Sequence, residues 1–389
     1  RSIDLRHGPE GAPLKGHFTK AYEYSDCWVE DSRLVALNAR DAAARGARIT
    51  TRTKVTMAQV VDGIWHVTLQ DQNSSARRIV RAQVLVNAGG PWVENIIRNT
   101  IGLDTKEGVR LVRGSHIITR KLYDHDKCYF FQGQDGRIIF TIPYETDFTL
   151  IGTTDVDHKD LEEKPVCQSE EQDYLLQFAS TYLKAPVTAE DVVATYSGVR
   201  PLYNDAASSA TAATRDYVLK LDNSAGAPLL NVFGGKITTY RKLAEQALQQ
   251  ISEHAPQMGQ AWTAGVALPG GDFPVDGVDE IIRQLITKFP FLTAPWARRL
   301  VKAYGNEAFD VLGAAQLASD LGEDFGASLT AREVTWLMDK EFAQTAEDVV
   351  WRRSKLGLRL SPAQIERLQT WMQQQLTAAR TGQAWAAIQ

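Results

Sequence analysis

The segment that most constrains the fold is residues 229–241, which reads LLNVFGGKITTYR. An apolar run of strand character ends in two glycines, and a helical pattern follows. The glycines, of which Gly235 is the second, let the backbone turn sharply and let another group approach it closely. Because Thr238 and Thr239 suit the first helical turn and Lys236 precedes it, free N–H groups and positive charge meet there. The segment therefore predicts a corner that stabilises an anion, although an ordinary strand–turn–helix joint would also need these glycines.

A second strand pattern, over residues 79–86, also ends in glycines, in the segment NAGGPW at 87–92. Proline at the first helical position loses no hydrogen bond, so Pro91 is expected to begin a helix. By itself this segment is only a weak indication of a cofactor contact. The segment at 229–241 is not a nucleotide-binding loop of the G-x-x-x-x-G-K-[ST] type either, because the first glycine and the four residues after it are missing.

The order of the patterns predicts an α/β part followed by an all-α part. Strand and helix patterns are mixed over residues 1–106, and the pair at 62–63, Asp-Gly, between two alternating runs is a strong hairpin signal. Successive extended runs over 107–230 favour an antiparallel sheet that carries a substrate face. Residues 231–272 return to the first domain and form a linker, and residues 273–389 read as a separate helical domain.

Composition limits the partners. A net charge of −4 over 389 residues does not support nucleic-acid binding, which favours a strongly basic face, so we expect no nucleic-acid partner. Cys27, Cys128 and Cys167 lie far apart without C-x-x-C spacing, which favours a reduced, cytoplasmic protein over a secreted one. No uninterrupted apolar run approaches the roughly 18 residues of a spanning helix. The chain begins with Arg1 rather than Met, which we interpret as a cut end.

Three cations stand at strand ends in one region of the chain, namely Arg200, Arg215 and Lys236. If they converge, they form a site for a doubly charged oxyanion, because guanidinium groups add bidentate geometry to attraction. Each of them alone could equally be a solvated surface cation. His116, in the segment RGSH, is a candidate base that titrates near neutral pH, although a lone histidine is more often structural. The seven histidines are scattered without metal-ligand spacing, so we predict no metal site.

Nine short segments follow one another along the chain: YSDCW at 24–28, NAGGPW at 87–92, RGSH at 113–116, IGTTD at 151–155, SGVRPL at 197–202, TRDY at 214–217, FGGKITTYRKLA at 233–244, LPGG at 268–271 and SDLGEDFG at 319–326. In this order they closely resemble the bacterial FAD-dependent, respiratory glycerol-3-phosphate dehydrogenases. The resemblance covers nearly the whole chain. It includes the helical C-terminal domain, which related amine and amino-acid oxidases lack.

The resemblance implies a partial FAD/NAD(P)-binding domain of the amino-acid-oxidase type, an antiparallel substrate-binding sheet and a helical C-terminal domain. The family begins with a strand–helix unit carrying G-x-G-x-x-G, which holds the FAD pyrophosphate. No such sequence occurs in these 389 residues. We therefore expect that an N-terminal segment has been removed, and that this chain by itself is inactive and binds FAD poorly.

The reaction implied is hydride transfer from C2 of sn-glycerol 3-phosphate to flavin N5, which gives dihydroxyacetone phosphate. By resemblance, Lys236 and the start of the helix after it stabilise the charge that builds on the flavin. Arg200 and Arg215 grip substrate oxygens, mainly those of the phosphate, with Lys236 and Thr239 beside them. His116 is the candidate base. The implied cofactor contacts are Val55, Ala88, Gly89, Trp92, Gly235, Lys236, Thr238 and Thr239.

The resemblance also implies partners. Electrons leave for membrane quinone, so the protein is expected in the cytoplasm, attached peripherally to the inner membrane through an apolar or basic surface. A homodimer is compatible with it. Two alternatives stay open. One is another flavin oxidase of the same fold that acts on an amine or amino acid and needs no phosphate grip, and the other is a cofactor-free anion-binding fragment.

Overall fold

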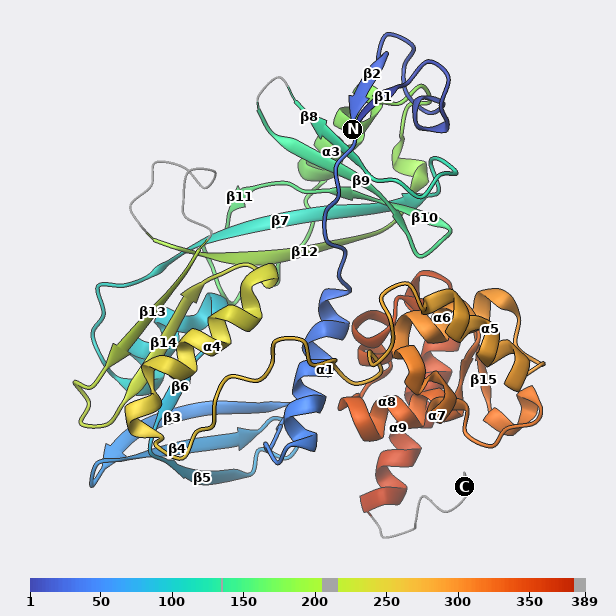
Figure 1. The fold of residues 1–389 in the computed structure, drawn as a ribbon. Helices are drawn as coiled ribbons and strands as arrows, with labels where there is room; N and C mark the ends of the chain where they lie inside the picture. Colours follow the sequence, from blue (N-terminus) through green and yellow to red (C-terminus); the bar gives the residue numbers. More distant parts are fainter. Residues whose placement is uncertain (134–135, 205–215, 381–389) are drawn as a thin grey trace. The chain divides into compact units, whose positions relative to one another are not determined.

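The computed structural model describes residues 1–133, 136–204 and 216–380. Chain contacts divide it into two compact units (Figure 1). The sheet unit consists of Arg1–Asp26 and Arg52–Ala261, and the helical unit consists of Cys27–Thr51 and Trp262–Gln389. This grouping does not test the domain boundaries predicted at residues 106, 230 and 272, which stay a prediction.

The helical unit is built from amphipathic helices and one short hairpin. Its apolar positions recur at helical spacing, so that side chains such as Leu285, Leu300 and Leu337 are fully buried between helices. Among the described residues, no helix combines the length and apolar character required to cross a bilayer. The elements are α1 (Asp31–Ala44), α5 (Val278–Lys288), α6 (Ala294–Tyr304), α7 (Ala308–Leu312), β15 (Asp324–Gly326), β16 (Leu329–Thr330), α8 (Ala331–Glu341) and α9 (Pro362–Arg380).

The predicted antiparallel sheet is present in the sheet unit, with the order β11-β7-β10-β9-β8 and with β12 paired to β7. Figure 1 shows β7 and β12 as two long neighbouring strands. Helix α3 (Ser169–Tyr182) packs against β7, β9 and β10 and buries the apolar residues of one face, Leu175 and Ile117 among them. The strands are β7 (Val109–Arg120), β8 (Tyr129–Gln132), β9 (Ile138–Tyr144), β10 (Phe148–Gly152), β11 (Val156–Asp157) and β12 (Val192–Tyr203).

The hairpin predicted around Asp62 and Gly63 is confirmed. Strand β3 (Thr53–Val61) pairs with β4 (Ile64–Asp71) across a two-residue turn. Both turn residues have positive φ, 52° and 74°, as the preferred two-residue hairpin turn requires. A third strand, β5 (Arg77–Ala82), completes this small sheet. A separate short pair joins β1 (Ser2–Asp4) to β2 (Lys20–Tyr22).

The prediction of one continuous strand over residues 79–86 is wrong. Strand β5 ends at Ala82 and pairs with β4, whereas β6 (Leu85–Asn87) pairs with β14 (Leu229–Gly234) in another sheet. The strand-like pattern continues through residue 86, but the backbone groups before and after residue 83 pair with different strands, and pairing defines a strand.

A mixed sheet of order β13-β14-β6 positions both glycine corners. Strand β13 (Tyr217–Asp222) runs antiparallel to β14, and β6 runs parallel to it with Asn87 opposite Asn231. Parallel neighbours end at the same edge of a sheet, so NAGGPW and GGKITT follow β6 and β14 at one edge.

Short helical turns follow both corners. The helix expected at Pro91 begins as a 3-10 turn over Gly90–Trp92 and continues as α2 (Val93–Asn95). The predicted helix after the second corner is α4 (Tyr240–Gln250), which begins after a 3-10 turn over Ile237–Thr239. Each glycine corner is therefore a strand–turn–helix connection, as its sequence predicts.

Candidate functional site

Two of the sequence segments singled out above lie directly opposite each other on β7 and β12. In this antiparallel pair Gly114 faces Gly198, and His116 faces Tyr196. Alternation along each strand then puts these four residues and Arg200 on one face of the sheet. The segments RGSH and SGVR, which are far apart in the chain, therefore form one surface.

The centre of that surface is a glycine floor, which we define as Gly114 and Gly198. A Cβ atom placed on Gly114 would lie 2.4 Å from Arg200 Nη2, so the Arg200 guanidinium lies over this glycine. At Gly198 a Cβ atom would meet no heavy atom of the described residues within 4 Å. The floor is therefore covered at one glycine and open at the other.

The His116 ring stands at one end of the glycine floor. It stacks on the Tyr196 ring with centroids 4.8 Å apart and an interplanar angle of 5°. On the other flank, a Cβ atom on Gly152 of β10 would lie 2.1 Å from His116 Cδ2. The imidazole is thus held between neighbouring strands on the site face, where a base needs a defined orientation.

Arg200 stands at the other end of the glycine floor and is about two-thirds buried. Its Nη1 forms a short ion pair with Asp155, and its Nη2 donates a hydrogen bond of 2.9 Å to Thr153 Oγ1. Side-chain exposures of 33% for Arg200 and 31% for Asp155 leave both groups accessible to a ligand. Thr153 and Asp155 belong to the segment IGTTD, but the sequence assigns neither a role, because their proximity to Arg200 depends on a strand pairing.

A buried carboxylate supports this surface from the opposite face of the sheet. Glu171 Oε1 accepts hydrogen bonds from Ser115 Oγ at 2.9 Å and Thr154 Oγ1 at 2.6 Å. Its Oε2 accepts from Arg113 Nη2 at 2.8 Å and from a backbone N–H at 3.1 Å. Burial alone would raise the pKa of Glu171, but these hydrogen bonds and the nearby Arg113 charge lower it overall. Ser197, opposite Ser115 on β12, completes the cluster through a hydroxyl contact of 2.8 Å.

The glycine corner after β14 lies beside the Arg200 end of the surface. Gly234 and Gly235 have φ of +67° and +107°, which side-chain-bearing residues rarely adopt. A Cβ atom on Gly234 would lie 3.5 Å from the carbonyl oxygen of Pro201, the residue after Arg200. Lys236 follows as an exposed residue in extended conformation, and Thr239 Oγ1 donates to its carbonyl oxygen at 3.0 Å. In the corner predicted to stabilise an anion, the Lys236 residue and the start of the helical turn after it are therefore at the surface.

The corner after β6 lies against the same elements. Asn87 Nδ2 donates to Asn231 Oδ1 at 3.0 Å and to the carbonyl oxygen of Val93, which joins the end of β6 to the middle of β14 and to the following helical turn. The turn containing Trp92, which is 47% exposed, packs against β12 and β14. A Cβ atom on Gly89 would lie 2.4 Å from Ile96 Cδ1, so this glycine has a packing role whatever else it contacts. Ala88 lies between Asn87 and Gly89 in this turn.

Most of the predicted site residues are therefore gathered on neighbouring elements of the sheet unit. His116, Arg200, Lys236, Thr238 and Thr239 lie on β7, on β12 and in the turn after β14. Two predicted residues are not part of this group. Val55 lies on β3 in a different sheet, and Arg215 lies outside the described residues.

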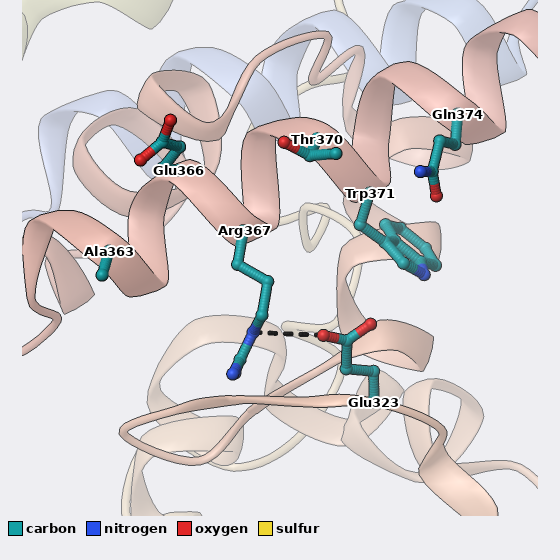
Figure 2. A pocket seen from close by; sticks show the side chains of 7 residues that line it. All are labelled: Glu323, Ala363, Glu366, Arg367, Thr370, Trp371 and Gln374. Carbon is teal, nitrogen blue, oxygen red and sulfur yellow. Dashed lines mark ion pairs between the residues drawn. The ribbon is translucent and has the colours of Figure 1, made fainter.

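The helical unit contains a pocket of its own, of about 470 Å³ (Figure 2). Arg367 Nε pairs with Glu323 Oε1 at 3.1 Å across it, and half of the Arg367 side chain is exposed. No predicted site residue is among those that line the pocket, and the charges of this pair neutralise each other. The candidate site is therefore the surface in the sheet unit. The pocket is lined by Glu323, Ala363, Glu366, Arg367, Thr370, Trp371 and Gln374.

Comparison with known proteins gives two family matches that together span most of the chain. Residues 5–241 match the family described as FAD dependent oxidoreductase. Residues 261–380 match the family described as C-terminal domain of alpha-glycerophosphate oxidase. The first match alone covers more than half of the chain.

Several curated proteins are similar over nearly all of the chain. The D-erythritol 1-phosphate dehydrogenase of Brucella abortus (strain 2308) is 42% identical over 371 residues, which are 95% of this chain and 74% of that protein. The glycerol-3-phosphate dehydrogenase of Pseudomonas aeruginosa PAO1 is 44% identical and is matched over 93% of this chain and 70% of its own length. The aerobic glycerol-3-phosphate dehydrogenase of Escherichia coli K12 is 40% identical over 97% of this chain and 76% of its own length.

Among solved structures, the glycerol-3-phosphate dehydrogenase from Bacillus halodurans complexed with FAD has a TM-score of 0.77 at 24% sequence identity. The match covers 99% of this chain and 77% of that one, so the two share a fold. The predicted class, an FAD-binding α/β part with an antiparallel sheet followed by a helical C-terminal domain, is confirmed. The chain belongs to the FAD dependent oxidoreductase family, with the C-terminal domain of the alpha-glycerophosphate oxidases.

Proposed function

We propose that this protein oxidises sn-glycerol 3-phosphate to dihydroxyacetone phosphate with FAD as the electron acceptor. The relatives named glycerol-3-phosphate dehydrogenase, at 40% and 44% identity over most of the chain, support the substrate class. The observation that carries the proposal is the paired arrangement on β7 and β12, where a histidine and an arginine stand at opposite ends of a glycine floor. Such a surface offers a base, a phosphate grip and room for a small carbon chain.

Residues at the two corners fit the flavin end of FAD. The parallel strands β6 and β14 end side by side, and ligands of α/β sheets bind outside the carboxyl ends of strands. Ala88, Gly89 and Trp92 would contact the flavin from one corner. Gly235, Lys236, Thr238 and Thr239 would contact it from the other, with exposed backbone and positive charge. When bound, FAD supplies a two-electron acceptor for a hydride from substrate C2.

The proton and the hydride leave the substrate by different routes. His116 takes the proton from the O2 hydroxyl, because its ring is fixed on the site face by Tyr196 and Gly152. Loss of this proton together with the C2 hydride would leave a carbonyl group at C2. Lys236 would stabilise the negative charge that develops on the cofactor.

The phosphate would be held by Arg200, with Arg215, Lys236 and Thr239 as the further proposed contacts. The support for Arg200 is its fixed guanidinium over Gly114, held by Thr153 and Asp155 and still one-third exposed. An arginine in a defined orientation can offer a bidentate pair of donors to a phosphate. Asp155 opposes a phosphate electrostatically, so substrate binding would redistribute the Arg200 contacts.

The electron acceptor, the cellular location and the oligomeric state are proposed from the resemblance to respiratory dehydrogenases. We propose membrane quinone as the electron acceptor, and peripheral attachment of a homodimer to the cytoplasmic face of the inner membrane. A quinone analogue should accept electrons from the loaded protein. Sedimentation with vesicles of inner-membrane lipid should report attachment, and light scattering should report the mass of a dimer.

A four-carbon polyol phosphate is the second candidate substrate. The observation that favours it is the 42% identity to the D-erythritol 1-phosphate dehydrogenase of Brucella abortus, which is as similar as the glycerol-3-phosphate relatives. Both substrates carry a secondary hydroxyl and a phosphate, so the same residues would serve either. The proposed chemistry does not depend on which of them is preferred.

The deciding experiment is loading of the purified chain with FAD, followed by gel filtration and a dye-reduction assay. We expect oxidation of glycerol 3-phosphate and no activity on glycine or sarcosine. If the chain takes up no FAD, the assay is repeated with a second form of the protein that has been refolded in the presence of excess FAD. Activity on the amino acids alone would support an amine or amino-acid oxidase, and phosphate binding without FAD uptake in either form would support an anion-binding fragment.

A further inference from the structure

We infer that Gly198 is a specificity-determining position, and that the open space above it receives the carbon chain of the polyol phosphate. The inference rests on the proposed function, since it concerns the same site. It adds that the absence of a side chain at position 198 sets how long a polyol the site accepts.

Glycines on the three neighbouring strands differ in what occupies the space above them. Cβ atoms on Gly114 and Gly152 would lie 2.4 and 2.1 Å from the side chains of Arg200 and His116. These two glycines are explained by the packing of the chain's own side chains. A Cβ atom on Gly198 would meet no described heavy atom within 4 Å.

Backbone conformation does not explain Gly198 either. Its φ lies outside the positive range that favours glycine, and it sits in the regular part of the β7–β12 pairing, opposite Gly114. A glycine within a strand weakens the strand and commonly marks a place where a ligand or another backbone approaches. The described residues place no heavy atom within 4 Å of that position, so the surface leaves room for a ligand to approach the backbone there.

The position of Gly198 identifies which part of the ligand this is. Tyr196, which stacks on the proposed base, precedes it by two residues, and Arg200, the proposed phosphate grip, follows it by two. Four residues of strand span about 13 Å. Gly198 is paired with Gly114, over which the Arg200 guanidinium lies, so it flanks the space between this guanidinium and the His116 ring, and the carbon chain of the substrate is proposed to lie over it.

A methyl group at this position should discriminate by substrate length. One methylene more or less in a fitted site changes kcat/KM by about 10- to 200-fold. In the FAD-loaded protein, Gly198→Ala should lower kcat/KM for a four-carbon polyol phosphate at least about tenfold more than for glycerol 3-phosphate. Gly198→Val should impair both substrates.

The matched control is Gly259→Ala in the same unit. A Cβ atom on Gly259 would also meet no described heavy atom within 4 Å, and its φ is not positive, but this glycine lies outside the site. The control should leave both kcat/KM values unchanged. A second readout does not need turnover: calorimetric binding of dihydroxyacetone phosphate to the oxidised protein should weaken in Gly198→Val, and binding of inorganic phosphate should not.

Each outcome decides the inference. Equal kcat/KM values for Gly198→Ala and wild type on both substrates would overturn it. A lower melting temperature for Gly198→Ala than for Gly259→Ala would show that the chain itself fills the space, and would also overturn it. If the wild-type protein with FAD oxidises neither polyol phosphate, the proposed function is wrong. The Gly198 inference is tested separately by binding: if Gly198→Val binds dihydroxyacetone phosphate as tightly as wild type does, the inference is wrong as well.

Discussion

Individual residues on β7, β10 and β12 take part in the site in pairs rather than singly. The His116 ring depends on Tyr196 for its stack and on Gly152 for its space. The Arg200 guanidinium likewise depends on Asp155 for its ion pair and on Gly114 for its space. A substitution at one member of a pair therefore changes the orientation of the other, and variants have to be chosen so that the two effects can be separated.

The phosphate grip is tested with Arg200→Ala in the FAD-loaded protein. Removing one partner of a charged, partly buried interaction should reduce transition-state stabilisation for glycerol 3-phosphate, as measured from the ratio of kcat/KM values, by about 2–4 kcal/mol. Oxidation of glycerol, which has no phosphate, should suffer far less. Because Arg200→Ala also exposes the Asp155 carboxylate, the double variant Arg200→Ala/Asp155→Asn removes that repulsion and should keep most of the loss. Arg6→Ala, at an exposed ion pair of the same unit, is the control. Equal losses for both substrates would contradict the phosphate role.

The base is tested with His116→Ala, followed by stopped-flow measurement of cofactor reduction. Loss of a general base should lower the rate by roughly 10²–10⁴-fold and flatten the acid limb of the pH profile. Tyr196→Phe keeps the stacked ring and should retain both the rate and the limb. An unchanged acid limb in His116→Ala would move the role to Lys236 or to water.

Among the elements, helix α3 supports the site through the Glu171 carboxylate as well as through its apolar packing against the sheet. Glu171, in the first turn of α3, binds Ser115 on β7 and Thr154 after β10, and reaches Ser197 on β12 through Ser115. It is 7% exposed and Ser115 is fully buried. Ser115 is followed in the chain by His116, the proposed base. Thr154 is preceded by Thr153, which accepts a hydrogen bond from Arg200. The helix therefore sets the relative position of the strands that carry the proposed base and the phosphate grip.

This support should depend on pH in a defined direction. The pKa of Glu171 in the folded protein is below its ordinary value of 4.5, so the ionised carboxylate stabilises the fold. That stability is fully present above about pH 4.5 and is lost as the pH falls through the lower folded-state pKa. Glu171→Gln should lower the free energy of unfolding at pH 7 by about 1–3 kcal/mol, and this difference should shrink below pH 4.5. Urea unfolding across pH measures it, with the exposed neighbour Glu170→Gln as control. A difference that stays constant down to the acid transition would refute the account.

At the scale of the whole molecule, chain order and compact units do not coincide. Residues 27–51, which include α1, belong by contacts to the helical unit, although the segments before and after them belong to the sheet unit. Buried charge pairs tie α1 to the C-terminal helices. Arg33 forms a buried ion pair with Glu341 and donates to the carbonyl oxygen of Ala303 at 2.7 Å. Arg40 pairs with Glu307 at 2.7 Å.

The helical unit should therefore be sensitive to the charges of α1. Arg33→Ala leaves the fully buried Glu341 carboxylate without its main partner, which typically destabilises a protein by about 3–5 kcal/mol. Replacing both residues, as in Arg33→Met/Glu341→Leu, should recover most of this loss because neither charge of this pair is then left buried without its partner. Arg283→Ala removes an exposed pair in the same unit and is the control. Unfolding is followed by tryptophan fluorescence. A single variant as stable as the control would show that α1 is not held by this pair.

Local patterns predicted much of the fold. The Asp62-Gly63 turn, the successive strands of the antiparallel sheet, the two glycine corners and the helical C-terminal part all depend on short-range rules of turn geometry and side-chain periodicity, which a sequence displays directly. The same rules failed at residues 79–86, because a strand-like pattern does not reveal that its two halves pair with different strands.

The residue types that the chemistry needs can be read from the sequence: the histidine, the arginine and the lysine at a helix start. The order of the segments also identified the family. Which of these residues come together depends on the pairing of distant strands. The register between β7 and β12 set Gly114 opposite Gly198 and His116 opposite Tyr196, and the same sheet brought Asp155 to Arg200. Pairing between strands so far apart in the chain is chosen by burial on both faces of the sheet and by hydrogen bonding of the whole strand, and neither is contained in a local pattern.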